Sequence, residues 1–581
     1  MSERNPATPV ASSVLQRLLP FLDWWPRMNA KSLRLDVLAG ITVALVAIPQ
    51  ALAYAQLAGL PPYYGLYAAL LPTIVGALFG SSGQLSTGPV ALTALVTAAS
   101  IAAVAPATEA QYIASAIALA LLAGLFQLAF GILRLGVLMN LLSNPVLMGF
   151  VNAAAILITL SQVPALVGTP APGTGHALSD GWFVLSHIAQ AHPPSIAFAV
   201  AALGALIAFR RLWPRLPGVL ITVVLLTAVS YAAGFASHGG QVVGDIPRGL
   251  PALALPEFAP DAWIIFLPAA FVIAIISFME AMSSAKIAEI RTGTKWDENQ
   301  ELIGQGLAKL AAALSQTMPV SGSFSRSALN LSVGARTGVS SIVCALCVLL
   351  ALLFVTPLLY HLPLPVLAAI IVMALSGLIN LHPLRVAHRA SRDDAVAAIL
   401  TFVATIAYAP QIQNGIYAGI LVSLGLFIYR RMRPTVEVVE PDSDQLMREM
   451  PAEAPAGLTS AVGIVRFEAS LVFVNVSFFE AAVRHLEHQH RGLRYVLVSA
   501  ASINRLDASG VEMLSSLQDS LGRNGVTMAF SGANADVLAV MERTGLARRI
   551  GAENFFLSER AAFAALASRF AQLQVPPPQA A

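Results

Sequence analysis

Two short stretches decide the fold of this chain. One is Gly88-Pro89, which precedes ALTALV at 91–96, and the other is Ser321-Gly322-Ser323-Phe324-Ser325-Arg326, which precedes SALNLSV at 327–333. Both interrupt an apolar segment with helix-start chemistry, in matching places in two halves of the chain. A helix N-terminus presents unpaired backbone N–H groups and about half a positive charge. Two such ends that face each other predict a binding site for a negative ion, to which Arg326 adds a full charge.

The composition places most of the chain in a lipid bilayer. Of the 581 residues, 57% are hydrophobic and 11% are charged, and the mean hydropathy is +0.72. Apolar runs of about 20 residues, the length that crosses a bilayer, recur between Val37 and Tyr429. These values exclude an ordinary soluble protein and predict a polytopic carrier or channel. The first residues, MSERNPATPV, lack the apolar core of a cleavable signal peptide, so we expect the first span to insert the chain.

The apolar runs predict a mainly α-helical membrane protein with fourteen spans, arranged as two groups of seven. An odd number of spans in the first half inverts the second half relative to it, as in the inverted repeats of carriers. Spans three and ten are short, and the Gly-, Ser- and Thr-rich residues before them fit membrane depth only where they line a wet cavity. The expected spans are 37–57, 63–79, 88–103, 112–130, 141–160, 196–209 and 218–235, then 263–284, 302–316, 325–333, 339–355, 366–381, 394–408 and 415–429.

The basic residues predict the orientation of the spans. Lys and Arg precede the first span and follow even-numbered spans, whereas the loops after odd-numbered spans carry acidic residues, with Arg248 almost their only base. Because basic loops stay on the cytoplasmic side, we expect both termini in the cytoplasm and the spans in the plasma (inner) membrane.

A Pro- and acid-rich stretch after Arg433 marks a change of domain. Beyond it, strand-type and helix-type segments alternate, which predicts a small cytoplasmic α/β domain. The expected strands are 464–467, 472–475, 495–499, 527–531 and 555–557, and the expected helices are 479–489, 509–521, 535–543 and 561–573. The expected domains are an N-terminal segment (1–34), a transmembrane transport domain (35–432), a linker (433–460) and the soluble domain (461–575).

Four motifs, in order along the chain, carry a resemblance to a known family. They are AGITVALVAIPQALAYAQLAGLPPYYGLYAAL at 39–70, LFGSSGQLSTGPVAL at 78–92, NPVLMGFVNAAAILI at 144–158 and NQELIGQGLAKLAAALSQTMPVSGSFSRSALNLSVGARTG at 299–338. The chain resembles, over nearly its whole length, the sulfate permease (SulP/SLC26-type) family of anion transporters with a C-terminal STAS domain, named after sulfate transporters and anti-sigma antagonists. The resemblance implies a core domain that carries the anion site and moves against a gate domain, in a homodimer.

The resemblance also places the substrate site. In the family this site lies around spans one, three, eight and ten, which implies that Gln50, Tyr54, Val90, Ser325 and Arg326 bind the substrate here. Val90 is smaller than the aromatic residue of some relatives, which suggests a roomier site and weakens the case for a small monovalent ion.

Arg326 and Glu280 are the charged candidates. A guanidinium in the membrane is costly unless it meets an anion, a carboxylate or water, so Arg326 binds substrate, or forms a structural ion pair with Glu280, or does both. Burial favours a protonated carboxyl group and a nearby guanidinium favours the ionised form, so Glu280 is poised to carry a proton with the anion. In the family, an acidic residue here is linked to cation coupling, with Glu typical of proton-coupled members and Asp of sodium-dependent ones. Ser284, one turn on, either adds its hydroxyl to this spot or packs against a neighbouring helix.

Span one supplies two polar candidates. Gln50 follows Pro49, which breaks or kinks the helix, and its amide either contacts substrate or forms a hydrogen bond between helices. Tyr54 stands one turn further on and either contacts substrate or packs. In span ten, Ser325 is expected to offer a hydroxyl and a backbone N–H to the ion.

Other candidates favour structural roles. Glu301 is expected at a solvated helix start, and Cys344 and Cys347, three residues apart in an apolar run, are expected to pack within a helix. His176, His187, His192 and His238 lie in expected outward loops without metal-ligand spacing, so we expect no metal site and no cofactor.

The soluble domain carries one regulatory candidate. Residues 504–510, Asn-Arg-Leu-Asp-Ala-Ser-Gly, resemble the loop in which bacterial anti-sigma antagonists receive phosphate, but Ala508 stands where the acceptor usually follows the Asp. A phosphorylation switch would need Ser509, and the alternatives for Asp507 are protein docking and helix capping.

These features favour a secondary active transporter of a small anion, with sulfate first, then C4-dicarboxylate, then bicarbonate, coupled to protons or else to sodium. A second hypothesis is an anion channel or a membrane sensor that signals through the soluble domain. An enzyme or a nucleotide-driven pump is disfavoured because the chain has no G-x-x-x-x-G-K-[ST] motif and its soluble part has no paired catalytic acids. No nucleic-acid partner is expected.

Overall fold

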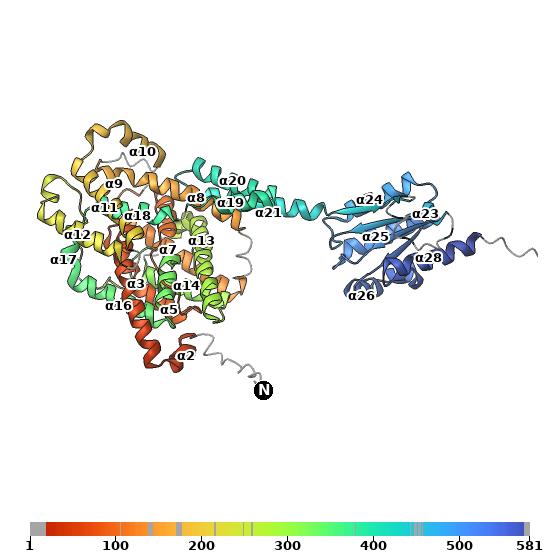
Figure 1. The fold of residues 1–581 in the computed structure, drawn as a ribbon, viewed down its shortest axis with the longest axis horizontal. Helices are drawn as coiled ribbons and strands as arrows, with labels where there is room; N and C mark the ends of the chain where they lie inside the picture. The colour runs from red at the N-terminus through yellow and green to blue at the C-terminus, as the bar shows by residue number, and fades with distance from the viewer. Residues whose placement is uncertain are drawn as a thin grey trace, which may run out of the picture. The chain divides into compact units, whose positions relative to one another are not determined.

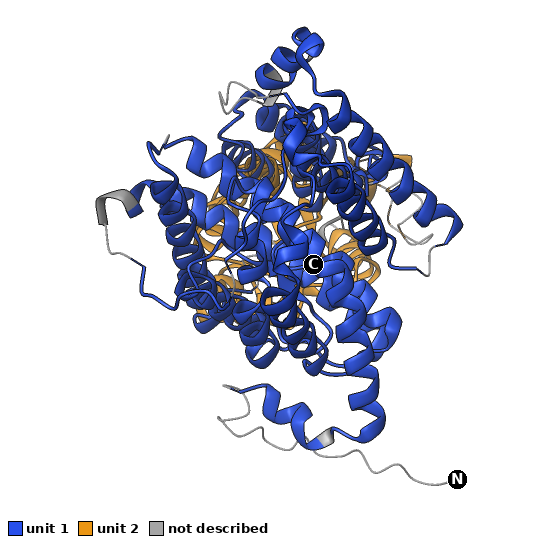
Figure 2. Cartoon of the chain, turned by 90° about the vertical axis from the view of Figure 1, so that its left-hand side faces the viewer, with its two compact units in different colours: residues 1–423 blue, residues 424–581 orange. Residues whose placement is uncertain are grey.

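The structure is a computed structural model that describes most of the chain. The described residues are 19–104, 106–136, 143–169, 177–213, 216–247, 249–256, 260–377, 379–441, 443, 444, 446, 450, 455 and 457–574. The chain divides into two compact units, residues 1–423 and 424–581, which Figure 2 colours separately.

Unit 1 is helical, and a helix lies on each of the fourteen expected spans. Span two is broken into two short helices, and span eleven contains a π-helical turn at Ala351–Val355. The helices are α3 (Ala30–Leu57), α4 (Tyr63–Ala68), α5 (Leu71–Phe79), α6 (Ala91–Ala102), α7 (Glu109–Ile132), α8 (Asn144–Ser161), α11 (Pro193–Leu212), α12 (Gly218–Ala232), α13 (Pro260–Thr292), α14 (Glu298–Leu314), α15 (Phe324–Val333), α16 (Val339–Leu350), α17 (Thr356–Leu359), α18 (Leu364–Ser376), α20 (Arg392–Ala407) and α21 (Gln413–Met432), which runs on into unit 2 (Figure 1).

Seven stretches of helix among the described residues are long and apolar enough to cross a membrane, and four shorter helical stretches are apolar. The fold is thus that of a polytopic membrane protein, while the count of fourteen crossings stays a prediction. Further short helices were not expected: α2 (Phe21–Trp24), α9 (Val163–Val167), α10 (Ala177–Ser186) and α19 (His382–Ala390).

The helices of unit 1 pack as two groups. In the first, α14 packs on α5 and α7, α13 on α6 and α7, and α3 on α15 and α16. In the second, α8 packs on α10 and α20, and α11 on α12 and α18. The two groups meet along α3, which also contacts α12 and α18. Figure 1 shows α3, α5, α14 and α16 together in one part of the unit. One face of α3 therefore packs against the other helices of the first group, and another face packs against the second group.

Unit 2 is a five-stranded sheet with helices on both faces. The strands are β3 (Val436–Val439), β4 (Val462–Phe467), β5 (Tyr495–Ser499), β6 (Thr527–Ser531) and β7 (Phe555–Phe556), in that spatial order; β3 is antiparallel to β4 and the other pairs are parallel. The helices are α23 (Leu458–Ala461), α24 (Val476–Gln489), α25 (Ala508–Arg523), α26 (Ala535–Arg543), α27 (Leu546–Ile550) and α28 (Glu559–Gln574).

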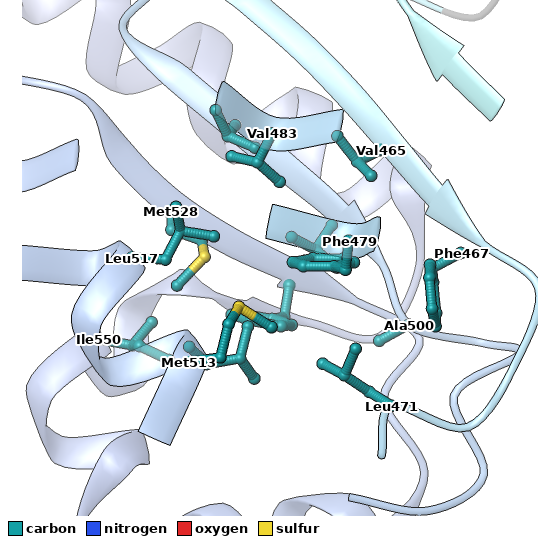
Figure 3. Close-up of a cluster of buried hydrophobic side chains, with 14 of the residues drawn as sticks. Val465, Phe467, Leu471, Phe479, Val483, Ala500, Met513, Leu517, Met528 and Ile550 are labelled. Atoms are coloured by element: carbon teal, nitrogen blue, oxygen red, sulfur yellow. The ribbon is translucent and has the colours of Figure 1, made fainter. Parts of the chain in front are cut away.

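Alternate residues of each strand serve the two faces of this sheet. Val465 and Phe467 of β4 join a buried cluster with Phe479 of α24 and Leu517 of α25 (Figure 3). Ile464, the residue before Val465, belongs to a second cluster on the opposite face, with residues of α23 and α28. The alternation explains why the central strands are almost continuously apolar.

Two expectations for the soluble domain are wrong. Residues 472–475 do not form a strand, because the Asn475 side chain accepts a hydrogen bond from the Val472 N–H and donates to the Ser470 carbonyl, which closes a turn at the start of α24. A strand that was not expected, β3, lies within the Pro- and acid-rich stretch and pairs with β4. Its VEVV sequence alternates only twice, which is too short a signal to separate it from the residues around it.

Candidate functional site

The two interrupted spans meet. Residues Thr87–Gly88 (β1) and Ser321–Gly322 (β2) form an antiparallel pair, with Thr87 opposite Gly322. Helices α6 and α15 begin two to three residues beyond this pair. The pairing therefore fixes two helix N-termini next to each other within the first group of helices, as the sequence predicted.

Side chains from other helices hold this pair in place. The Thr73 hydroxyl donates to the Thr87 carbonyl at 2.8 Å, and Gln305 Nε2 donates to Thr87 Oγ1 at 2.8 Å. The Ser323 N–H donates to the Ser86 carbonyl at 2.8 Å. Because all of these groups are buried, each hydrogen bond replaces one that water would otherwise supply.

The two helix ends differ in their caps. At α15 the Ser323 hydroxyl accepts a hydrogen bond from the Arg326 N–H, so one of the first N–H groups has a side-chain partner. At α6 the N-cap residue is Val90, which has no side-chain oxygen to offer and is itself buried. The start of α6 thus keeps N–H groups without a capping side chain, which is the arrangement that binds anions.

Arg326 lies between the two helix ends. Its side chain is 2% exposed. Nη1 donates to the Pro89 carbonyl at 2.9 Å and Nε to Ser86 Oγ at 3.4 Å, so the guanidinium from the second half is anchored on the first. Nη2 is buried and has no hydrogen-bond partner among the described residues. A narrow pocket beside it is lined by Ala47, Ala69, Thr73, Ser86, Thr87, Gly88, Pro89 and Cys344. A buried N–H without a partner is costly, so Nη2 is a donor that remains available to an acceptor.

Glu280, on α13, completes the charged part of the site. Its carboxylate interacts electrostatically with Arg326 and Lys309 and contacts Ser321 of β2, while its Oε2 atom is buried without a hydrogen-bond partner. No ion pair within 4.0 Å joins Glu280 to Arg326, although the structure describes both. The structural ion pair that the sequence left open is therefore not formed here, and both groups keep an unused hydrogen-bonding atom.

Helix α3 presents Ala47, Gln50 and Tyr54 on one face, since these residues are three and four apart. Ala47 lines the pocket beside Arg326, and the Tyr54 ring is close enough to interact with both Arg326 and Glu280. Gln50 Oε1 is buried without a partner, and Gln50 also lines a larger cavity of about 520 Å³. Tyr54 therefore lies near the charged groups, and Gln50 shares its helix face and lines the larger cavity.

The other predicted residues are placed as follows. Ser325, in the first turn of α15, is exposed, and its hydroxyl lies 3.5 Å from that of Ser323. Ser284 is buried and donates to the Glu280 carbonyl within the same helix, so its hydroxyl is engaged by the backbone and not by the Glu280 carboxylate. Cys344 is buried and Cys347 partly buried, both free.

The expectation of a solvated Glu301 is wrong. Glu301 is 1% exposed and accepts hydrogen bonds from the backbone N–H groups of Ser81 and Ser82 and from the Gln305 amide. Asp36 makes the corresponding contacts from the other half, accepting from the N–H groups of Arg336 and Thr337. Each carboxylate fixes the loop beside the interrupted span of the opposite half, which periodicity in one segment cannot reveal.

Sequence reasoning missed Lys309. This residue of α14 is fully buried, and its Nζ donates to Gln127 Oε1 at 2.9 Å. A usable signal existed, because Lys309 is the one charged residue in the expected span 302–316, and a charge within a span is a functional hypothesis in itself.

In unit 2, Asp507 caps α25. Oδ1 accepts from the Gly510 N–H at 2.9 Å and Oδ2 from the Phe473 N–H at 2.8 Å. Ser509 is partly exposed in the first turn of this helix. The described residues contain no group of His, Cys, Asp and Glu that could hold a metal ion, and His176 lies outside them.

Comparison with known proteins agrees with this architecture. Residues 33–401 match the Sulfate permease family and residues 455–562 match the STAS domain. The chain belongs to the sulfate permease family. It is 32% identical to "Probable sulfate transporter 4.2" of Arabidopsis thaliana, with 90% of this chain and 80% of that protein covered, and 33% identical to a "Probable sulfate transporter" of Mycobacterium tuberculosis, with 90% and 94% covered.

Two solved structures share the fold. Murine Solute Carrier 26 family member A9 superposes with a TM-score of 0.86 over 98% of this chain and 97% of that one, at 21% identity. The transmembrane domain of a cyanobacterial bicarbonate transporter, BicA, superposes with a TM-score of 0.58 over 68% of this chain and 99% of that one, at 26% identity. From its family, this chain is an anion transporter with a helical membrane unit and a STAS unit.

Proposed function

We propose that the protein is a secondary active transporter that moves sulfate across the plasma (inner) membrane together with protons. The observation that carries this proposal is the buried Nη2 of Arg326, which lacks a partner between two helix N-termini. Sulfate offers several charged oxygen acceptors to such donors. The relatives that are named sulfate transporters support the choice of this anion.

A cavity of about 520 Å³ begins at Gln50, on the face of α3 that also carries Tyr54. It extends to Arg210 in the last turn of α11 and to Pro217 in the loop between α11 and α12, and is also lined by Leu329 of α15. The positive-inside rule assigns that loop to the cytoplasm. We propose that this is an inward-open form, in which substrate leaves along the face of α3 where the two helix groups meet.

Glu280 is proposed as the proton carrier. Its carboxyl group lies beside the anion site, and its unpaired Oε2 atom can hold a proton without breaking a hydrogen bond. Protonation when substrate binds would neutralise a charge that repels sulfate, which couples the two movements. The STAS unit is proposed as a regulatory or docking module, and the transporter as a homodimer.

The test is uptake by purified protein in liposomes, with labelled sulfate, succinate and bicarbonate compared under imposed proton and sodium gradients. We expect an inward proton gradient to drive sulfate accumulation, and Glu280→Gln to abolish it. Accumulation driven by sodium alone would contradict proton coupling. A passive conductance that persists in Glu280→Gln would favour a channel. Preferred uptake of bicarbonate, the second candidate because of the similarity to BicA, would replace sulfate as substrate.

A further inference from the structure

Lys309 is a second buried basic residue near the proposed proton carrier. It lies on α14, which packs against α7, and its Nζ donates to Gln127 Oε1 on α7 at 2.9 Å. The Gln127 amide in turn donates to the Ala274 carbonyl at 2.7 Å and to Ser277 Oγ at 2.9 Å, both on α13. These contacts hold the ammonium group against α13 about one turn before Glu280.

Hydrogen bonding alone does not explain a lysine here. The Gln127 carbonyl oxygen needs one donor, which a neutral amide side chain would supply without burying a charge. An ammonium group in the membrane interior is costly unless negative charge lies nearby. The negative group that the structure supplies is the Glu280 carboxylate, with which Lys309 interacts electrostatically.

The charges around the site can be counted. Among the described residues, the other titratable groups that interact with Glu280 or Arg326 are Lys309 of α14, Tyr54 of α3 and Cys344 of α16. With Lys309 protonated and Tyr54 and Cys344 neutral, ionised Glu280 leaves two cations and one anion, a net charge of +1. Protonation of Glu280 raises the net charge to +2, which matches a dianion. Without Lys309 the protonated site would carry only the charge of Arg326 and would match a monovalent anion.

We infer that Lys309 sets the charge of the anion that the site accepts, making a protonated site complementary to a dianion. This inference rests on the proposed function, because it takes the anion site to lie between α6 and α15. Lys309 acts through the electrostatic potential at that site and is not a ligand of the anion.

The experiment uses two tetrahedral oxyanions of similar shape and different charge, sulfate and perchlorate. Their binding to the purified full chain is measured by calorimetry at one fixed pH, for wild type, Lys309→Gln and Lys309→Arg. The energy of an ion in an electrostatic potential is proportional to its charge, so losing the Lys309 charge costs sulfate twice as much binding energy as perchlorate. Because the dissociation constant depends exponentially on this energy, the factor by which it rises for sulfate (the loss factor) is the square of the factor for perchlorate. For Lys309→Gln we expect a loss of about tenfold for perchlorate and about 100-fold for sulfate, which is what Coulomb's law gives for charges about 12 Å apart at an effective dielectric constant near 20. Lys309→Arg should restore the preference for sulfate.

Equal loss factors for the two anions, or no loss, would overturn the inference. Melting curves identify a variant that fails to fold, and Gln127→Glu then provides the second test. That variant places a carboxylate next to Nζ, so it cancels the same charge while Lys309 stays in place, and it should show the same squared relation. If the wild type binds no sulfate, the proposed function fails; if it binds sulfate and the variants keep the wild-type preference, the inference about Lys309 alone fails.

Discussion

The two halves of the membrane unit contribute the same backbone device but different side chains. Each half supplies a two-residue strand followed by a short helix, and the strands pair with each other. The first half adds uncharged groups, among them Gln50, Tyr54 and Thr73, whereas Glu280, Lys309 and Arg326 all come from the second. The symmetry of the two halves therefore positions the helix ends, whereas all of the charged side chains named here come from the second half.

The largest expected effect tests this asymmetry directly. Arg326→Ala should weaken sulfate binding by about 100-fold, because it removes a charge-assisted hydrogen bond from a dry site. Binding to purified protein gives the measurement. Arg336→Ala is the matched control, since that exposed arginine lies three residues beyond α15 and its backbone contact with Asp36 is kept. Equal losses in the two variants would mean that the overall positive charge, and not the site, attracts the anion.

The second prediction concerns the carboxylates that tie each half to the other. Asp36→Ala should lower the stability of the membrane unit by about 3 kcal/mol, because the buried N–H and hydroxyl of Thr337 and the partly buried N–H of Arg336 lose their acceptor. Glu301→Ala should act similarly through Ser81 and Ser82. Thermal unfolding in detergent measures both effects. A large loss of stability in only one of the two variants would show that only that carboxylate stabilises the packing of one half against the other.

The paired strands allow a finer comparison, through Gly322 and Gly88. A Cβ atom at Gly322 would lie 2.9 Å from the backbone Cα of Ala281, so Gly322→Ala should cost about 1 to 2 kcal/mol of stability by overpacking. A Cβ atom at Gly88 would meet Arg326 Nη2 at 3.0 Å, a group at the end of a flexible side chain. Gly88→Ala should therefore keep the melting temperature and weaken sulfate binding. A lower melting temperature for Gly88→Ala together with an unchanged one for Gly322→Ala would mean that strand β1 and not β2 is packed against α13.

The smallest expected effect lies in unit 2. Arg466 makes two hydrogen bonds to the Glu559 carboxylate, at 2.8 and 3.2 Å, and this contact lowers the pKa of Glu559 from its ordinary value. A carboxyl pKa lowered by folding stabilises the folded state above the unfolded pKa, about 4.3, and that contribution is lost as the pH falls below it. Hydrogen exchange of β4 amides in the full chain should show this loss as the pH is lowered from about 5 to about 3. Glu559→Gln should flatten the profile, whereas exposed Glu512→Gln should not.

Much of the fold follows from the sequence, because membrane spans are long apolar runs and leave strong local signals. Each expected span falls on a helix, and the positions of the two interruptions are confirmed by the pairing of β1 with β2. Strand β3 was missed for the opposite reason, since four residues of VEVV carry little periodic signal and the strand depends on its pairing with β4.

The sequence by itself determined that two apolar segments are interrupted by helix starts and that one of them carries Arg326, since both features follow from local chemistry. Only the tertiary structure decided which groups are satisfied. Glu301 and Asp36 accept hydrogen bonds from backbone N–H groups of distant loops. Arg326, Glu280 and Gln50, in contrast, each keep a buried polar atom that has no partner in the part of the chain that the structure describes. The reason is that hydrogen bonds over more than 200 residues depend on how helices pack, which no single segment encodes.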